Sequence, residues 1–232
     1  MTVTIATSKL IDTLKDALQT AGTGVHFATH RGPWRDEPGD VDLLAATSSS
    51  GYVVGHTWIP IAGQVRQPSV WPVDAAETVL AICKSLARKG EEHTVDIDMV
   101  MADPPDDAKE GDHPGWTVTL SETPALFDSD TEFQFHAHSE DKFPLRTVRR
   151  IFAGDITLQR GDFEETPLTL WSATVLAPLV AVAKRRKMQL QFFRSSERSV
   201  QVKANGVTVT VDNPQGPVGQ TLAAAVAEAG AE

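Results

Sequence analysis

The sequence predicts an α+β protein, in which helices pack on β-sheets. Apolar residues recur at helical spacing in two segments within residues 1–140, and short runs of alternating apolar and polar residues flank both segments. The expected elements follow the same order twice: one strand, one helix and then three strands. We therefore expect a duplicated strand–helix–three-strand unit.

Both expected helices have recognisable ends. Apolar residues recur every three or four positions from Leu10 to Ala21, Ser8 is a suitable N-cap, and Gly22 follows as a stop. In the second segment, Asp74 and Glu77 have the spacing of a capping box, the apolar face runs from Val79 to Ala87, and Gly90 ends the helix. The sequence therefore predicts one helix that ends before Gly22 and another that begins at Asp74.

The strands of both units are expected from period-two alternation and from the turn residues between them. The run 48–51, three serines and a glycine, is expected to form a hairpin turn, and 32–40, with two prolines and two glycines, is expected to be a loop. The expected strands cover 3–5, 24–30, 41–47, 51–61, 69–73, 94–101, 116–120 and 132–138.

A second block is expected after residue 155. Strands are expected over 156–160, 167–171, 188–193, 199–204 and 207–211. A third helix with an apolar face from Val175 to Ala183 contains Pro178, so it either kinks there or starts nearer Ala177. Residues 222–229 form either a short helix or an alanine-rich tail.

Residues 143–152 have the character of a connector between these two blocks. The stretch contains Pro144 and three arginines but no acid, and it follows the most acidic part of the chain. We expect a first domain over 1–142, a connector over 143–155 and a second, shortened domain over 156–232.

Composition is that of an ordinary globular protein, with 232 residues of which 41% are hydrophobic and 22% are charged. No apolar run approaches the ~20 residues of a membrane-spanning helix, and residues 1–10 do not have the pattern of a secretory signal. Cys83 is the only cysteine, which excludes an intrachain disulfide and a thiolate metal cage. We expect a cytoplasmic protein with no membrane partner, no metal and no cofactor.

The net charge of −10 is unevenly distributed. Residues 91–141 contain fifteen acids and one base, a balance of −14, so the rest of the chain carries +4. We expect the acids to form a solvated surface and the helical bases to hold a duplex through its phosphates without reading its sequence. The alternative for the bases is stabilisation of helix C-termini. The candidate DNA-binding residues are Lys9, Lys15, Lys84, Arg88, Lys89, Lys184, Arg185, Arg186 and Lys187.

The sequence contains no recognisable catalytic constellation. It has no glycine-rich phosphate loop, no G-x-S-x-G nucleophile elbow and no H-E-x-x-H metal motif. His136 and His138 share one face of an expected strand near Asp141, and a metal-dependent enzyme built on these residues is one alternative. A solvent-facing strand that carries histidines explains the same pattern. We expect a protein that is not an enzyme.

Several short stretches, taken in order, share motifs with one known family. Residues 45–61 run from Ala-Ala-Thr through Gly-Tyr-Val-Val to Ile-Pro-Ile, and 143–151 contain Phe-Pro followed by Arg-Arg-Ile. These resemble the Thr-Asp-Gly-His-Arg-Leu stretch and the Tyr/Phe-Pro-Asp-Tyr-Arg-Arg-Val connector of the bacterial-type DNA polymerase sliding clamp, a ring-shaped processivity factor. Residues 72–89, 174–187 and 199–214 are similar to its basic helices and a hairpin. The order and spacing match the strand–helix rhythm above.

The resemblance implies the DNA-clamp fold, in which helices line the inside of a ring and sheets form its outside. It also implies that the ring encircles double-stranded DNA, has DNA polymerase and a clamp loader as partners, and is a homo-oligomer joined head to tail. Bacterial-type clamps have three domains per chain, whereas this sequence has one full domain and a shorter block. Similarity in size to short phage clamps favours a trimer over a dimer.

The resemblance also places a partner-peptide pocket beside the connector. Its expected residues are Gly51, Tyr52, Val54, Pro144, Arg150 and Ile151. The sequence departs from the family in this region, because Ser50, Tyr52 and Val53 replace the Asp, His and Arg of the motif. In addition, residues 219–232 do not match the apolar C-terminal segment that completes the family's pocket.

The sequence leaves two non-enzymatic functions open. The first is a DNA sliding clamp that encircles duplex DNA without sequence specificity and tethers replication proteins. The second is a clamp-fold interaction module that binds or regulates replication proteins without encircling DNA. The shortened second domain motivates this alternative.

Overall fold

The computed structural model of the chain describes residues 2–34, 38–50, 53–65, 67–87, 93–103, 113–123, 132–148, 173–187, 191–194, 200–204 and 207–209. The described helices are α1 Thr7–Ala17, α2 Val73–Ala87 and α4 Ala173–Arg186, and a short 3-10 helix η1 spans Glu140–Lys142. The described strands are β1 Val3–Ala6, β2 Val25–Pro33, β3 Asp40–Ser49, β4 Val54–Pro60, β5 Ser69–Trp71, β6 Thr94–Met101, β7 Trp116–Glu122, β8 Glu132–Ser139, β9 Gln191–Arg194, β10 Val200–Ala204 and β11 Val207–Val209.

The described strands form one antiparallel sheet in the order β1-β6-β7-β8-β5-β2-β3-β4-β11-β10-β9. The first strand of each unit pairs with the other unit, because β1 pairs with β6 and β5 pairs with β2. The first eight strands are therefore two equivalent halves, β1-β6-β7-β8 and β5-β2-β3-β4, each of which includes one strand from the other unit. This topology confirms the predicted α+β class and the repeated order of elements.

The two halves meet at both of their ends. At one junction, β5 and β8 pair through Ser69 with Ser139 and Val70 with His138. At the other, Thr4 and Ala62 exchange backbone hydrogen bonds of 2.9 and 3.1 Å. Strand β4 also pairs with β11, so α4 and its three strands continue the sheet of the first eight strands.

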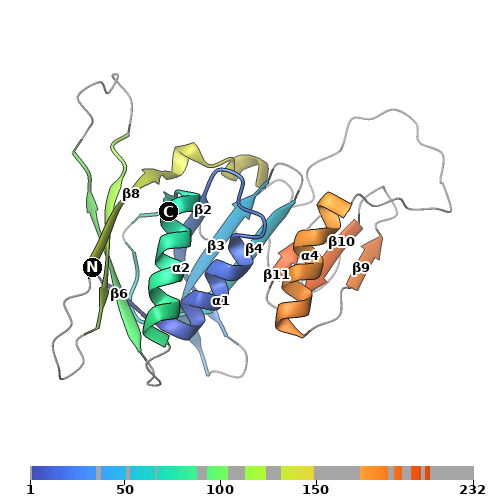
Figure 1. Cartoon of the computed structure of the whole chain (residues 1–232), viewed down its shortest axis with the longest axis horizontal. Helices are drawn as coiled ribbons and strands as arrows, with labels where there is room; N and C mark the ends of the chain where they lie inside the picture. Colours follow the sequence, from blue (N-terminus) through green and yellow to red (C-terminus); the bar gives the residue numbers. More distant parts are fainter. Residues whose placement is uncertain are drawn as a thin grey trace.

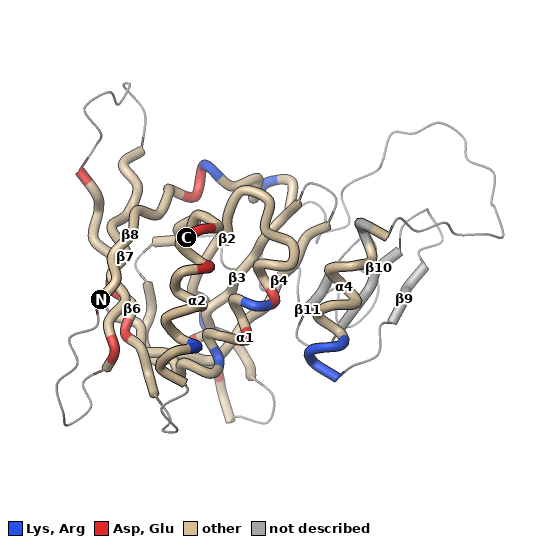
Figure 2. The backbone as a smooth tube through the Cα atoms, in the orientation of Figure 1, with Lys and Arg blue, Asp and Glu red and all other residues tan. Residues whose placement is uncertain are grey.

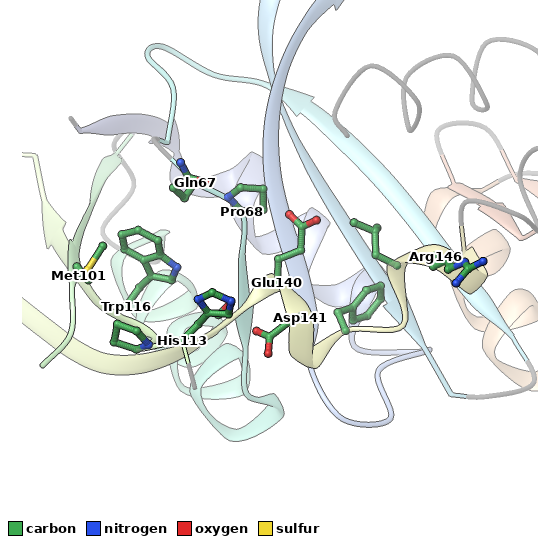
Figure 3. A pocket seen from close by; sticks show the side chains of 12 residues that line it. Gln67, Pro68, Met101, His113, Trp116, Glu140, Asp141 and Arg146 are labelled. Carbon is green, nitrogen blue, oxygen red and sulfur yellow. The ribbon is translucent and has the colours of Figure 1, made fainter. Parts of the chain in front are cut away.

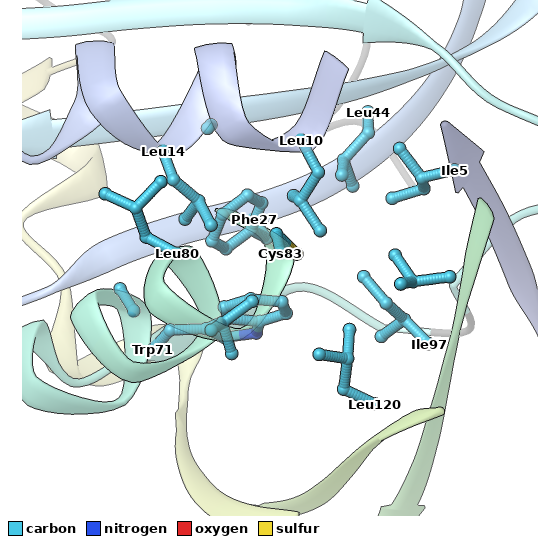
Figure 4. Close-up of a cluster of buried hydrophobic side chains, with 14 of the residues drawn as sticks. Ile5, Leu10, Leu14, Phe27, Leu44, Trp71, Leu80, Cys83, Ile97 and Leu120 are labelled. Carbon is cyan, nitrogen blue, oxygen red and sulfur yellow. The ribbon is translucent and has the colours of Figure 1, made fainter. Parts of the chain in front are cut away.

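The main core lies between the sheet and helices α1 and α2 (Figure 4). Leu10 and Leu14 of α1 and Val79 of α2 are fully buried, and Phe27 of β2 contacts the Trp71 ring with a centroid separation of 4.2 Å. Full burial of such a side chain stabilises the fold by ~1.5–3 kcal/mol relative to exposure. Figure 1 shows α1, α2 and α4 on the same side of the strands.

Helix α1 differs from its prediction at both ends. Ala6, not Ser8, is the N-cap residue and has no side-chain cap, and the Thr7 N–H instead donates to the His93 carbonyl at 2.8 Å. The helix ends at Ala17 rather than Ala21, and the Ala17 carbonyl accepts hydrogen bonds from the Ser48 hydroxyl of β3 at 2.7 Å and from the Thr20 N–H at 3.1 Å. A tertiary contact therefore caps this helix.

Helix α2 begins at Val73, so the predicted capping box that started at Asp74 is wrong. The Pro72 carbonyl accepts the Ala76 N–H at 2.9 Å, which makes Pro72 the residue before the helix. Proline tolerates this position because its missing N–H has no partner there. Asp74 lies in the first turn of α2, where its negative charge interacts favourably with the positive end of the helix dipole.

The β2–β3 hairpin is longer than predicted. The two strands pair from Val25 with Ser48 to Pro33 with Asp40, so part of the predicted loop 32–40 and of the predicted turn 48–51 belongs to strands. Ser48 is fully buried and forms a 2.6 Å hydrogen bond with Thr20. The serine is a buried polar contact rather than a turn residue.

Helix α4 starts at Ala173 and not nearer Ala177, so Pro178 lies in its interior. The elements predicted over 156–160, 167–171 and 222–229 lie outside the described residues. The boundaries of the first domain, the connector and the second domain stay predictions. Residues 145–148 within the connector form a helical turn, and the Val148 N–H donates to the Pro144 carbonyl at 3.0 Å.

Candidate functional site

The described basic residues of the predicted DNA face lie on three helices. Lys9 and Lys15 are on α1, Lys84 is on α2, and residues 184–187 form the C-terminal end of α4 (Figure 2). Lys9, Lys84, Lys184 and Lys187 are exposed, whereas Lys15 is half-buried. These helices share one side of the sheet, and each of them carries at least one exposed lysine, while α2 also carries the exposed acids Asp74 and Glu77.

Arg185 and Arg186 have a different environment from the neighbouring lysines. Arg185 donates to Asp12 at 3.0 Å and also contacts the Asp16 carboxylate. The Arg186 guanidinium donates twice to Asp16 Oδ2, at 3.0 and 2.7 Å, and lies 3.8 Å from Asp12. We call these four residues the α1–α4 ion-pair cluster. It joins two helices that are more than 150 residues apart in the sequence.

Asp16 is the buried centre of this cluster. Its side chain is 1% exposed, whereas those of Asp12, Arg185 and Arg186 are 48%, 24% and 28% exposed. Burial and the adjacent Arg186 charge lower the pKa of the Arg185 guanidinium, while Asp12 opposes this shift, and arginine keeps its charge at neutral pH. The cluster therefore holds two positive charges against one buried and one exposed carboxylate.

The sequence did not point to Asp12 and Asp16 as partners of the basic cluster. Both acids occupy positions four residues apart on α1, a spacing that places two side chains on one helix face. Asp16 lies directly beside the apolar position Ala17, and no feature of the sequence marked it as buried.

Val54 and Pro144 are the two residues of the predicted peptide pocket that the structure describes. Val54 of β4 belongs to a second buried cluster with Val70 of β5 and three connector residues, Phe143, Leu145 and Val148. All five side chains are at most 9% exposed. Pro144 is exposed beside the cluster, so the structure does bring β4 and the connector together.

The remaining predicted site residues have no described placement. Gly51, Tyr52, Arg150 and Ile151 of the pocket lie outside the described residues, as do Arg88 and Lys89 of the DNA face. Their roles stay predictions.

Polar and aromatic contacts fix the start of the connector to the sheet. The Phe143 ring stacks on His26 of β2 with a centroid separation of 5.3 Å. The His26 Nε2 atom lies 3.7 Å from the Glu140 carboxylate, and the Phe143 N–H donates to the Glu140 carbonyl at 3.0 Å. The connector therefore begins as an ordered structure on the face of the sheet opposite Phe27 and Trp71.

An open pocket of about 810 Å³ lies on the other flank of the connector (Figure 3). Its walls come from three separate segments: the approach to β5, the ends of β6 and β7, and η1 with the connector. The lining residues that matter chemically are Met101, Trp116, Glu140, Asp141, Phe143 and Arg146. Of these residues, only Asp141 was considered in the sequence, and then as a metal ligand rather than as part of this pocket.

The histidine pair considered for metal binding is on the exposed face of β8. The His136 and His138 rings lie edge to face with a centroid separation of 5.7 Å, and both residues are exposed. Among the described residues, no group of three or more histidine, cysteine or acidic side chains is arranged to hold a metal ion. No described helix is long and apolar enough to cross a membrane.

The topology and the helical side together define a class of protein. A twice-repeated strand–helix–three-strand unit, whose helices share one side of a continuous antiparallel sheet, is the architecture of the DNA sliding clamps. The chain has this fold.

Solved structures with the same fold include bacterial DNA polymerase beta subunits and sliding clamps. The chain matches the DNA polymerase III subunit beta of Pseudomonas aeruginosa with a TM-score of 0.51 and 10% identity, over 95% of this chain and 67% of that one. It matches the DNA polymerase sliding clamp of Bacillus subtilis with a TM-score of 0.51 and 12% identity, over 94% and 66% of the two chains. The chain thus spans about two thirds of the length of these structures.

Sequence comparison is less informative than structural comparison for this chain. No known protein-family model matches the sequence, and no curated protein sequence matches it significantly.

Proposed function

We propose that the chain is a DNA sliding clamp that encircles duplex DNA without reading its sequence and tethers replication proteins. The observation that carries the proposal is that α1, α2 and α4 lie on one side of the strands (Figure 1) and that each of them carries an exposed lysine. Phosphate contacts of this kind are exchangeable and do not depend on sequence, so a ring lined by them slides. Nothing in this role requires catalysis or a cofactor.

The free edge of β8 supports assembly into a ring. β8 occupies the place in its half of the sheet that β4 occupies in the other, and β4 pairs with β11 of the second block. Among the described strands, β8 has a partner on its second side only at His138 and Ser139. An unpaired strand edge is a template for another strand. We propose that a second copy of the chain pairs here, and that a trimer closes the ring.

The ion-pair cluster separates the candidate DNA-binding residues into two groups. Lys9, Lys84, Lys184 and Lys187 are exposed and contact phosphates, with Lys15, Arg88 and Lys89 as further contributors. Arg185 and Arg186 chiefly hold α4 against α1, because they pair with Asp12 and Asp16. Their contribution to DNA binding is secondary.

DNA polymerase and a clamp loader are the proposed protein partners. Their peptides bind beside the connector, at a pocket formed by Gly51, Tyr52, Val54, Pro144, Arg150 and Ile151. Support comes from the contact between β4 and the connector, which brings Val54 close to the residues that flank Pro144. The protein acts where replication occurs, in the cytoplasm of a bacterial or phage-infected cell.

The salt dependence of DNA binding tests the DNA face. Replacing Lys184 and Lys187 with glutamine removes two exposed charges at the C-terminal end of α4. Each lost phosphate contact makes the negative slope of log K against log salt less steep by ~0.9. Lys142→Gln is the matched control, because Lys142 is exposed on η1, away from the helices. Equal slopes for the double variant and the control would remove these lysines from the DNA face.

A clamp-fold interaction module that does not encircle DNA is the second candidate. The ion-pair cluster favours it, since two of the four bases at the end of α4 are neutralised by acids of the same chain. If this candidate is correct, the purified protein recovers polymerase or loader subunits in a pull-down. The same protein is not retained on circular DNA.

A further inference from the structure

The open pocket beside the connector lies at an incompletely paired junction of the two sheet halves. β5 and β8 pair over only two residue pairs, and the pairing does not continue past Ser69. Pro68 precedes Ser69 and has no N–H to donate, so the ladder ends there. The equivalent junction between Thr4 and Ala62 is held by two hydrogen bonds. The pocket therefore occupies the junction at which the chain turns away from the sheet.

One wall of this pocket is an exposed apolar surface. Met101 is 62% exposed, which makes it one of the few large apolar side chains that the described surface presents in this way. Met101 lies beside Trp116, because the two residues are partners in the β6–β7 ladder. Figure 3 shows both side chains on the same side of the pocket. Such surfaces mark sites of protein interaction, and methionine adapts to varied apolar partners.

The middle of the pocket carries negative charge. Glu140 and Asp141 project from η1 between the Trp116 wall and Phe143 (Figure 3). Glu140 also lies near His26, so Asp141, whose side chain is 45% exposed, is the more accessible carboxylate. A hydrogen bond from Ser139 lowers the pKa of Asp141, which keeps this carboxylate ionised at neutral pH.

The two ends of the pocket differ in charge. His113 lies near Asp141, and the Lys142 ammonium group is 3.9 Å from the Asp141 carboxylate. Arg146 lines the opposite end, and Figure 3 shows its guanidinium group far from the two carboxylates. A ligand with one basic group therefore binds with that group at the Asp141 end, beside the apolar wall. Nucleic acid is a poor match, because its phosphates would face Glu140 and Asp141.

We propose that this pocket binds a short peptide segment of a protein partner, in which a lysine or arginine adjoins a large apolar residue. The basic group pairs with Asp141, and the apolar side chain packs on Met101 and Trp116. Phe143 and Leu145 separate this pocket from the Val54 cluster, because both residues belong to that cluster and also line the pocket. The site shares no residue with the partner-peptide pocket proposed above, and its function does not depend on encirclement of DNA.

Peptide binding tests the proposal directly. The probes are two blocked, dye-labelled tetrapeptides, leucine–lysine–phenylalanine–leucine and the same peptide with glutamate in place of lysine, and fluorescence anisotropy gives their affinities. We expect the lysine peptide to bind more tightly. Asp141→Asn is expected to weaken it by about two- to fivefold, and Met101→Ala together with Asp141→Asn by about tenfold or more.

Two matched controls separate the pocket from general attraction to an acidic protein. Glu77→Gln removes one negative charge from the exposed surface of α2, and Val180→Ala shortens an exposed apolar side chain of α4. Both controls are expected to leave peptide affinity unchanged. Equal losses in Glu77→Gln and Asp141→Asn, or no preference for the lysine peptide, would overturn the proposal.

A second copy of the chain is the competing occupant. In that case Met101→Ala with Asp141→Asn would lower the mass of the protein in solution and leave peptide affinity unchanged. That pair of results would also overturn the proposal. Both residues are substantially exposed, so thermal unfolding of the double variant is expected to match that of the wild type.

Discussion

Cys83 reports on the integrity of the core because it is the only cysteine and is fully buried in α2. Burial raises the pKa of its thiol to about 12, so the reactive thiolate is scarce at neutral pH. We expect an aromatic disulfide reagent to modify Cys83 only as fast as the core opens. Reaction in the native protein at the rate of a free thiol would contradict this packing.

His56 is a buried histidine that makes stability depend on pH. Burial, reinforced by His30 and His26, lowers its pKa from 6.5 to about 3, and its Nδ1 atom is 2.8 Å from the Thr47 hydroxyl. The unfolded chain therefore binds a proton at His56 between about pH 6.5 and 3, whereas the folded chain does not. As pH falls through this window, the free energy of unfolding should decrease by up to ~1.4 kcal/mol per pH unit from this group.

Comparison with His56→Gln isolates this contribution from the carboxylates that titrate in the same window. Glutamine retains a hydrogen-bonding group for Thr47 but takes up no proton. We expect a shallower decrease of stability in the variant, measured by urea unfolding at several pH values. Parallel curves for the two proteins would show that His56 is protonated normally in the fold.

At the scale of elements, the ion-pair cluster attaches α4 to α1. Asp16 is almost fully buried and contacts both arginines, so Asp16→Ala leaves two guanidinium groups without their main counter-charge. We expect a loss of ~3 kcal/mol in the free energy of unfolding, as is typical when one partner of a buried pair is removed. Faster hydrogen exchange of the α4 amides should accompany this loss.

Asp12→Ala is the control for the same cluster. Asp12 accepts from Arg185 at 3.0 Å, but its side chain is 48% exposed, and solvent screens such pairs to less than ~1 kcal/mol. Similar small losses for both substitutions would mean that Asp16 is not the centre of the attachment.

The sequence was sufficient for the elements that depend on local patterning. Strand β6 was predicted with its observed ends, Thr94 and Met101. Apolar and polar residues alternate along this run, and this local pattern is typical of a strand with one buried face. The ends of α1 were not predictable in this way, since a hydroxyl from Ser48 and a carbonyl from His93 cap them. Residues distant in sequence supply both groups.

The same distinction applies to the candidate site. Charge clustering indicated the bases of α1, α2 and α4, which the structure places on one side of the sheet. It did not separate Lys184 from Arg186, because the difference depends on Asp16, which lies 170 residues away from Arg186. The pocket beside the connector was not predicted either, since its walls come from three separate segments.

At the scale of the whole molecule, the free edge of β8 is the proposed contact between copies. Gln134→Lys with His136→Lys places two exposed lysines on this strand, and charged side chains on an edge oppose pairing with another strand. We expect the mass in solution to fall to that of one chain. Ala81→Lys on the exposed surface of α2 is the control and should leave the mass unchanged.

Imaging of purified particles by negative-stain electron microscopy, with the mass measured on the same sample, tests the central claim most directly. A ring made by β8 contacts, with helices on its inner side, predicts closed particles with a central opening and the mass of three chains. Particles without an opening, together with the mass of a single chain at micromolar concentration, would contradict the account.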